Sequence, residues 1–334
     1  MIVDFYIVWY CIDMNKRRRD AIAACDISKT ATYSLGGYPQ KVLIEGRSEK
    51  NPIVIFLHGG PGSPIPFSVG SRGLFPEYTE CCTLVFWDQL GCGINRFPIG
   101  DSFTTEVFAD MTADLVRAIR EEYPDHPVNL FGVSYGSVLA AKTAAKIPEL
   151  LDHVVVYGQI IKNLSFNEVT FSALEKSSMP AKSKHRLSLL RERETHTTED
   201  IMKMVTWVKK YTEGYRSKTA EGTPLAPVFW GLLTSPDYSL KDFKAVFINE
   251  YSKSADLFQE LLRLDLTDTL ENISIPYLIM QGSKDIVTPT EIVSAFMSEN
   301  RNENLSFSII EDCGHMPSAA GMKEILKQLV EFVK

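Results

Sequence analysis

Short apolar runs alternate with helical patterns between Lys41 and Tyr157, and this alternation constrains the fold more than any other feature of the chain. The runs are rich in β-branched and aromatic residues, and they lie at 53–57, 84–87, 128–131 and 154–157. An apolar run without polar alternation is typical of a strand whose two faces are both covered by helices. Strands that alternate with helices form right-handed βαβ units. The sequence therefore predicts an α/β fold with a mainly parallel sheet.

Two helices are predicted between these strands. From Thr104 to Tyr123 apolar residues recur at helical spacing, and Pro124 then stops the pattern. An alanine-rich stretch over 137–147 predicts a second helix directly after the strand at 128–131. Both helices are expected to pack on the sheet.

A long interruption divides the α/β pattern. From 162 to 268 the chain carries charged helical stretches, including 182–200 and 201–211, and no strand pattern. The alternation then returns, with strands predicted at 277–280 and 305–310 and helices at 290–299 and 319–333. We therefore expect one discontinuous core, formed by 1–161 and 269–334, with a helical insertion over 162–268.

The composition narrows the class of protein. Hydrophobic residues make up 45% of the chain and charged residues 23%, which is ordinary for a soluble globular protein. The formal net charge of −7 argues against nucleic acid as a partner, because phosphate binding needs a concentrated basic face. We expect a small-molecule or short-peptide substrate and no membrane partner, and the oligomeric state stays open.

The cysteines and the N-terminus bear on the cellular compartment. The six cysteines include no C-x-x-C pair and no histidine at zinc-ligand spacing, so we expect reduced thiols, a cytoplasmic protein and no bound metal.

The apolar residues 2–12 precede the basic block 16–19, whereas a signal peptide has its positive charges first. We expect the first 30 residues to form a peripheral strand or helix with a charged turn.

The stretch from Gly132 to Gly136 has the pattern G-x-S-x-G and follows a predicted strand directly before a predicted helix. In this context the pattern is a nucleophile elbow, a sharp turn that holds a serine in a strained conformation above the sheet. Glycines on both sides allow such a tight turn. Ser134 is therefore the candidate nucleophile.

A serine hydroxyl needs a base to take its proton and an acid to orient that base. Asp285 follows the strand predicted at 277–280, and His315 follows the last predicted strand. The order Ser134, Asp285, His315 is the chain order of elbow-type hydrolases. Asp312 lies three residues before His315 and is a second candidate for the orienting acid.

Two backbone N–H groups usually receive the negative oxygen of a tetrahedral intermediate. The N–H of Tyr135, directly after the nucleophile, is one candidate. The second is expected in His58-Gly59-Gly60-Pro61-Gly62, where glycines let the backbone approach a substrate without a Cβ clash. We predict Gly60 as the donor, with Gly59 also contacting the substrate.

These motifs, together with Asp88-Gln89-Leu90-Gly91-Cys92-Gly93, resemble the proline iminopeptidase (prolyl aminopeptidase) branch of the α/β-hydrolase superfamily. The resemblance extends over the core segments on both sides of the insertion. It implies the α/β-hydrolase fold with a mainly parallel eight-stranded sheet flanked by helices, and a helical cap over the active site. It also implies cleavage of an acyl or peptidyl bond without a metal or other cofactor.

The chain departs from that branch at several positions, because Val133, Tyr135, Leu90 and Asn95 stand where the family often has glycine, tryptophan, arginine and serine. Aminopeptidases of this group hold the substrate's free amino terminus with acidic residues of the cap. Glu168 and Glu175 are candidates, since a spacing of seven places them on one face of a helix. Gln159, directly after a strand, is a further candidate for substrate binding.

Two activities therefore stay open. The first is an aminopeptidase of the proline iminopeptidase type, which acts through a Ser-His-Asp triad and an acyl-enzyme. The second is a carboxylesterase or lactonase that acts on small acyl esters. A third alternative, a non-catalytic small-molecule receptor on the same scaffold, is opposed by the complete triad. Epoxide hydrolases and haloalkane dehalogenases use an aspartate at the elbow, so Ser134 argues against both.

Overall fold

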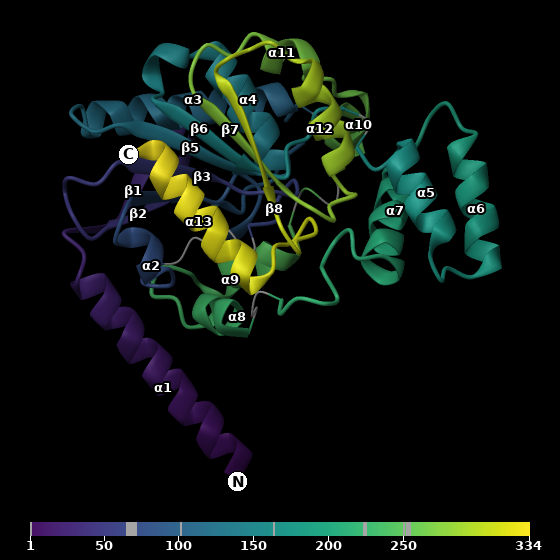
Figure 1. Cartoon of the computed structure of the whole chain (residues 1–334). Helices are drawn as coiled ribbons and strands as arrows, with labels where there is room; N and C mark the ends of the chain where they lie inside the picture. The colour runs from purple at the N-terminus through teal and green to yellow at the C-terminus, as the bar shows by residue number, and fades with distance from the viewer. Residues whose placement is uncertain are drawn as a thin grey trace.

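The computed structural model describes residues 2–64, 72–100, 102–162, 164–222, 226–249, 251 and 255–334. An eight-stranded sheet in the order β1-β2-β4-β3-β5-β6-β7-β8 forms its centre (Figure 1). The strands are β1 (Ile27–Leu35), β2 (Tyr38–Gly46), β3 (Ile53–Leu57), β4 (Thr83–Trp87), β5 (Val128–Val133), β6 (His153–Tyr157), β7 (Tyr277–Gly282) and β8 (Leu305–Ile310). From β4 to β8 all neighbours pair in parallel, whereas β2 is antiparallel to both β1 and β4. The predicted mainly parallel, eight-stranded sheet is confirmed.

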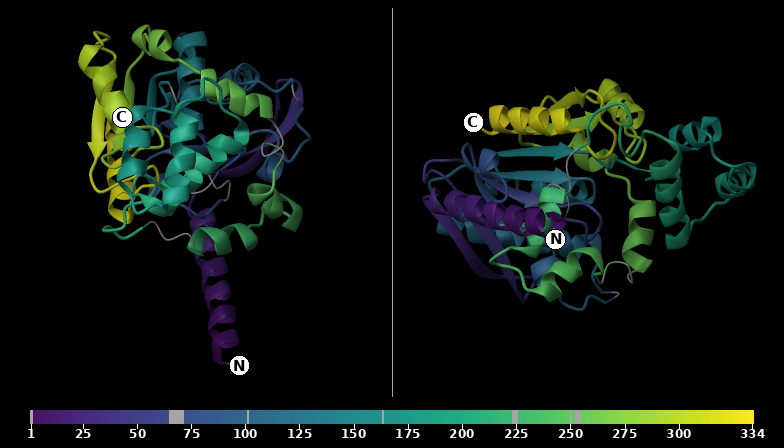
Figure 2. Two further views of the ribbon diagram at one scale, coloured as in Figure 1. Left: turned by 90° about the vertical axis from the view of Figure 1, so that its right-hand side faces the viewer. Right: turned by 90° about the horizontal axis from the view of Figure 1, so that it is seen from below.

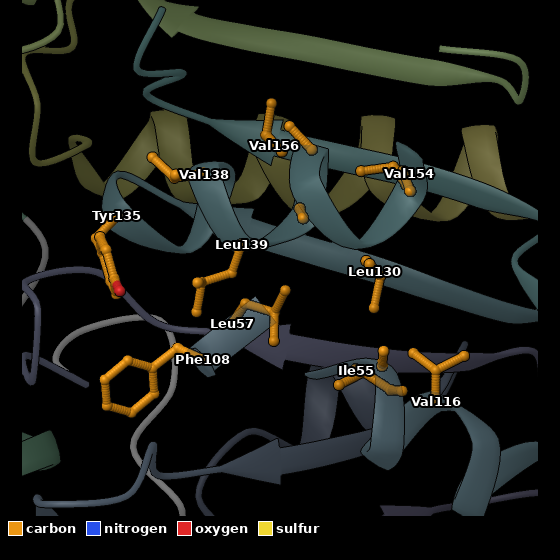
Figure 3. Close-up of a cluster of buried hydrophobic side chains, with 14 of the residues drawn as sticks. Ile55, Leu57, Phe108, Val116, Leu130, Tyr135, Val138, Leu139, Val154 and Val156 are labelled. Atoms are coloured by element: carbon orange, nitrogen blue, oxygen red, sulfur yellow. The ribbon is translucent and has the colours of Figure 1, made fainter. Parts of the chain in front are cut away.

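Both faces of the sheet are buried, which explains the unbroken apolar runs in the sequence. Along β3, Ile53, Ile55 and Leu57 pack with α3 (Thr105–Glu122) and α4 (Tyr135–Lys146) on one face. Val54 and Phe56 point to the other face, which is covered by α2 (Pro76–Thr79) and α13 (Ala319–Val333). Figure 3 shows side chains of the first face meeting those of α3 and α4.

The core helices end where the sequence predicts. Thr104 caps α3 by accepting a hydrogen bond from the backbone N–H of Val107, and the helix ends before Pro124. Helices α12 (Thr290–Glu299) and α13 match the predicted ranges. The parallel pairing from β4 to β8 brings the carboxyl ends of these strands to one edge of the sheet.

The hairpin of β1 and β2 was not predicted from its residue pattern. Its two-residue turn is Gly36-Gly37, and both residues have positive φ, +59° and +80°. A Gly-Gly pair between two alternating segments is a signal for such a hairpin turn. The hairpin extends the sheet beyond β4.

Between β6 and β7 the chain is helical, as expected for 162–268. The helices are α5 (Glu168–Lys176), α6 (Ala181–Arg191), α7 (Thr198–Tyr211), α8 (Ala226–Leu233), α9 (Leu240–Phe247), α10 (Ala255–Arg263) and α11 (Thr267–Glu271). Helices α5, α6 and α7 form a lobe beside the sheet (Figure 1), whereas α8 and α9 pack against Leu74 and Phe75, directly before α2. In the left view of Figure 2 this lobe faces the viewer in front of the sheet.

The predicted helical stretch 182–200 is wrong in its extent. The first helix ends at Arg191, and a new one begins at Thr198. The reason is a capping box, in which the Thr197 side chain accepts from the backbone of Asp200 and the Asp200 carboxylate accepts from the backbone of Thr197. The two side chains satisfy the N-terminus of α7 and so fix its start.

The N-terminal segment is the helix α1 (Ile2–Ala23), and it extends away from the rest of the molecule (Figures 1 and 2). The expected charged turn is wrong, because residues 16–19 continue the helix. Arg18 is buried and donates to the carbonyl of Gly231, so it ties α1 to α8. No helix within the described residues is long and apolar enough to cross a membrane.

The described cysteine side chains carry free thiols, as expected for reduced cysteines. They are Cys25, Cys81, Cys82, Cys92 and Cys313. Cys92 and Cys313 are fully buried and serve as small packing groups near the motif loops.

Candidate active site

The elbow at Ser134 joins β5 to α4. Ser134 has φ +53° and ψ −117°, a conformation that L residues rarely adopt. A Cβ at Gly136 would lie 1.9 Å from the carbonyl oxygen of Leu57, and one at Gly132 would lie 2.5 Å from that of Gly136. Both positions therefore require glycine. The strained turn is held in place by a hydrogen bond of 3.0 Å from the Ser134 N–H to the Tyr157 carbonyl.

Three side chains from separate loops form a hydrogen-bonded series at the carboxyl ends of the strands. The Ser134 Oγ lies 3.0 Å from the His315 Nε2. The His315 Nδ1 lies 2.8 Å from the Asp285 Oδ2. Ser134 follows β5, Asp285 follows β7 and His315 follows β8. The structure thus brings together the three residues that the sequence proposed as nucleophile, acid and base.

Asp285, not Asp312, faces the imidazole. The Asp285 carboxylate is buried and accepts hydrogen bonds from the backbone N–H groups of Val287 and Thr288 and from the Thr288 hydroxyl. Its remaining bond goes to His315. The side chain of Asp312 is 70% exposed and pairs with Lys284 at 3.2 Å. Of the two candidate aspartates, the structure therefore brings Asp285 and not Asp312 to the imidazole.

The loop after β3 runs beside the nucleophile, since a Cβ on Gly59 would lie 3.1 Å from the Ser134 Cβ. The Gly59 carbonyl accepts from the Ser63 N–H and from the His58 Nδ1, each at 2.9 Å. In the trans peptide between Gly59 and Gly60 the N–H of Gly60 points opposite to the Gly59 carbonyl. This N–H is therefore directed away from the Ser63 and His58 groups that donate to that carbonyl. Gly60 has φ +122°, and a Cβ there would meet the Gly62 and Ser63 nitrogens at 2.6 Å.

His58 orients this loop, a role that sequence reasoning missed. Its Nε2 accepts a hydrogen bond of 3.0 Å from the Gln89 N–H, and the Gln89 side chain donates to the His58 carbonyl at 2.9 Å. Burial lowers the pKa of His58 to about 4, so the imidazole is neutral at physiological pH. The signal was the position of His58 at the head of the glycine loop, next to the Asp88-Gln89 motif.

A cavity of about 440 Å³ opens above Ser134. The glycine loop, Ser134 and His315 line it, together with side chains of α7, α9 and α10. The lining is mostly apolar, and among the lining residues within the described part of the chain none carries a carboxylate. The apolar wall includes Ile160, Ile201, Met202, Val205, Val246, Phe247, Phe258, Leu261 and Val287.

Comparison with known proteins agrees with this architecture. Residues 52–319 match the family described as the alpha/beta hydrolase fold. The chain belongs to this family. The predicted enzyme class, a hydrolase of this fold, is therefore confirmed.

Two relatives of this hydrolase have names that describe them as peptidases. The probable aminopeptidase YbaC of Bacillus subtilis (strain 168) is 25% identical over 291 residues, which cover 85% of this chain and 89% of that protein. A proline iminopeptidase of Lactobacillus helveticus is 26% identical over 329 residues, with 89% of this chain and 95% of that protein covered. These relatives confirm the resemblance that the motifs indicated.

A solved structure shows the same fold. The crystal structure of proline iminopeptidase from Mycobacterium smegmatis aligns with the hydrolase at a TM-score of 0.62 and 17% identity. The alignment covers 91% of this chain and 97% of that one.

The structure does not bring the predicted acidic residues of the insertion to the cavity of the hydrolase. Glu168 and Glu175 share one face of α5, as their spacing implied, but that face meets Arg191 of α6. Both carboxylates bind the Arg191 guanidinium on the exposed surface. Helical spacing identifies a shared face, and packing decides which way the face points.

Of the other predicted substrate contacts, Gly59 lines the cavity and Gln159 does not. The Gln159 side chain is buried, where its amide donates to the Ile160 carbonyl and its oxygen accepts from the Tyr277 hydroxyl. The Tyr135 side chain also points away from the cavity, into the core beside Phe108 (Figure 3). In this hydrolase the ring of the residue after the nucleophile is therefore not part of the cavity.

Proposed function

We propose that this hydrolase is a serine aminopeptidase of the proline iminopeptidase type, with Ser134 as nucleophile, His315 as general base and acid, and Asp285 as the group that orients His315. The observation that carries the proposal is the hydrogen-bonded series of these three side chains, of which Ser134 and His315 line a mostly apolar cavity. The names of the relatives support the peptidase activity.

The proposed reaction uses these groups in turn. His315 Nε2 takes the hydroxyl proton as Ser134 Oγ bonds to the substrate carbonyl carbon. The N–H groups of Gly60 and Tyr135 would receive the negative oxygen that develops. The C–N bond then breaks, and His315 returns the proton to the leaving amine. Water attacks the acyl-enzyme by the same route and restores the serine.

We also propose that residues 162–268 act as a cap over this site, with the core formed by 1–161 and 269–334. Ile201 of α7, Phe247 of α9 and Phe258 of α10 line the cavity, which supports the proposal. A cap that excludes water strengthens the electrostatic interactions inside the site. We further propose a cytoplasmic location, which the free thiols support.

One observation favours a second candidate, a carboxylesterase or lactonase. The amino group of an aminopeptidase substrate is positively charged, and burying it requires an anionic partner. The cavity lining in the described ranges contributes no such carboxylate. An ester with a neutral apolar acyl group would need none.

A substrate panel separates the two candidates. Prolyl and alanyl naphthylamides are compared with short-chain acyl esters that also carry a naphthyl leaving group. Each substrate is tested with the unchanged protein and with Ser134→Ala. Release of amine by the unchanged protein alone supports the aminopeptidase. Hydrolysis restricted to the esters would move the function to the second candidate. If a fluorophosphonate fails to label Ser134 in the unchanged protein, both catalytic proposals are wrong and the receptor alternative stands.

A further inference from the structure

Lys209 carries the only ammonium group among the cavity-lining residues that the structure describes. It lies near the end of α7, where its Nζ stands 4.3 Å from the centroid of the Tyr215 ring. The Tyr215 ring is in turn 6.1 Å from the His315 ring, centroid to centroid. The ammonium is thus connected to the triad through a single aromatic side chain.

The position of this ammonium relative to the reaction can be assigned. In a serine mechanism the imidazole gives its proton to the leaving nitrogen, so the leaving group lies against His315. Tyr215 flanks His315, and Lys209 lies over Tyr215. Lys209 is therefore placed on the side of the leaving group.

The ammonium is also available to a ligand. Within the described residues no carboxylate forms an ion pair with Lys209, and its contact there is with the face of Tyr215. The nearby carboxylates of Glu213 and Asp312 both pair with Lys284 instead. A cation held over an aromatic ring keeps its charge and has donors left for an anionic group.

The distance between His315 and Lys209 determines how long a leaving group must be to reach the ammonium. The two ring distances place the Lys209 Nζ at most about 10 Å from the centre of the imidazole. An extended chain advances roughly 3.3–3.6 Å per residue. A leaving group of one to three residues therefore brings its terminal carboxylate to this ammonium.

We propose that Lys209 binds the C-terminal carboxylate of the leaving amino acid or short peptide, so that the enzyme prefers free di-, tri- and tetrapeptides to amidated or long peptides. This inference rests on the proposed aminopeptidase function. The ammonium acts on binding of the leaving group and takes no part in proton transfer.

The test compares prolyl-alanine with prolyl-alanine amide, with released proline as the readout. We expect the unchanged protein to favour the free acid by about tenfold in kcat/KM, the factor that corresponds to 1.4 kcal/mol. This preference falls as ionic strength rises, because the pair is partly exposed. In Lys209→Met the ratio of the two kcat/KM values falls to near one, and Lys209→Arg restores part of it.

Lys210 supplies the matched control. It is the next residue on α7, but its Nζ lies over Tyr211 and it does not line the cavity. Lys210→Met should keep the full preference. Equal hydrolysis of acid and amide by the unchanged protein, or a preference that survives in Lys209→Met, would overturn the inference while leaving the aminopeptidase function intact. Hydrolysis of neither peptide would overturn the proposed function and the inference together.

Discussion

At the scale of single residues, the two aspartates near His315 have opposite environments. Asp285 is buried and its carboxylate is oriented by three donors besides His315, whereas Asp312 is exposed and bound to Lys284. We expect Asp285→Asn to lower kcat by about 10³-fold to 10⁴-fold, because the imidazole loses its orienting carboxylate. Asp312→Asn should change kcat less than threefold. Steady-state rates on one active substrate measure both, and a large loss in Asp312→Asn would contradict the assignment.

His58 gives the protein a pH-dependent stability. Its pKa is lowered to about 4 in the folded state from 6.5, so the unfolded chain binds more protons between these values. Stability from this group is complete above pH 6.5 and is lost as the pH falls towards 4, by up to about 1.4 kcal/mol per unit. The cause is the burial of the imidazole, which disfavours its charged form.

The measurement for His58 is the free energy of unfolding of the protein and of His58→Gln across pH 4 to 8. The advantage of the unchanged protein over the variant should shrink as the pH drops through this window. A difference that stays constant with pH would show that His58 titrates normally.

Sequence reasoning reached the three triad residues because each follows a predicted strand and their order is set by the fold. It did not place the side chains of Glu168, Glu175 and Gln159, which lie outside the cavity. Periodicity along a helix says which residues share a face, but the direction of that face depends on contacts with α6 that are far apart in sequence. The role of His58 was missed because its contact with Gln89 also joins residues that are far apart in sequence.

At the scale of elements, the elbow depends on close contact between α4 and the end of β3. A Cβ on Gly136 would overlap the Leu57 carbonyl, which is backbone and cannot swing aside. We expect Gly136→Ala to destabilise the protein by about 3 kcal/mol or more. Gly100→Ala is the control, since a Cβ there meets nothing within 4 Å. Thermal unfolding of both variants tests this, and an unchanged Tm in Gly136→Ala would refute it.

The elements themselves were predictable to different degrees. Strands such as β3 and β8 match their predicted ranges because both ends are marked by polar or turn residues. The hairpin of β1 and β2 was missed because β1 is an edge strand of mostly small and polar residues, and because the apolar run of β2 is confined to Val42, Leu43 and Ile44. The division between α6 and α7 was missed because the capping pair Thr197 and Asp200 lies within a charged stretch.

At the scale of the whole molecule, the insertion is fastened to the loops that carry the triad. The Thr170 hydroxyl of α5 donates to the Ile286 carbonyl at 2.8 Å, next to Asp285. The N–H groups of His315 and Met316 donate to the carbonyls of Gly214 and Tyr215. Movement of the lobe is therefore expected to loosen the acid and base loops.

Hydrogen exchange can detect this coupling. Thr170→Val removes the hydrogen bond to the Ile286 carbonyl, worth about 1 kcal/mol, and should speed exchange of the Val287 and Thr288 amides by roughly fivefold. Thr206→Val is the control, because the Thr206 hydroxyl bonds within α7 to the Met202 carbonyl. Equal exchange at 287–288 in both variants would mean that α5 and the Asp285 loop open independently.

The hydrogen bonds between 214–215 and 315–316 bear on how such enzymes can be recombined. The segment after α7 belongs to the insertion by its place in the chain, yet its carbonyls support the backbone of the loop that carries the base. A chimaera that takes its whole insertion from a relative would replace that support and shift the imidazole. A chimaera in which the foreign helices are joined before Thr212, and residues 212–222 stay with their native core, would keep these hydrogen bonds.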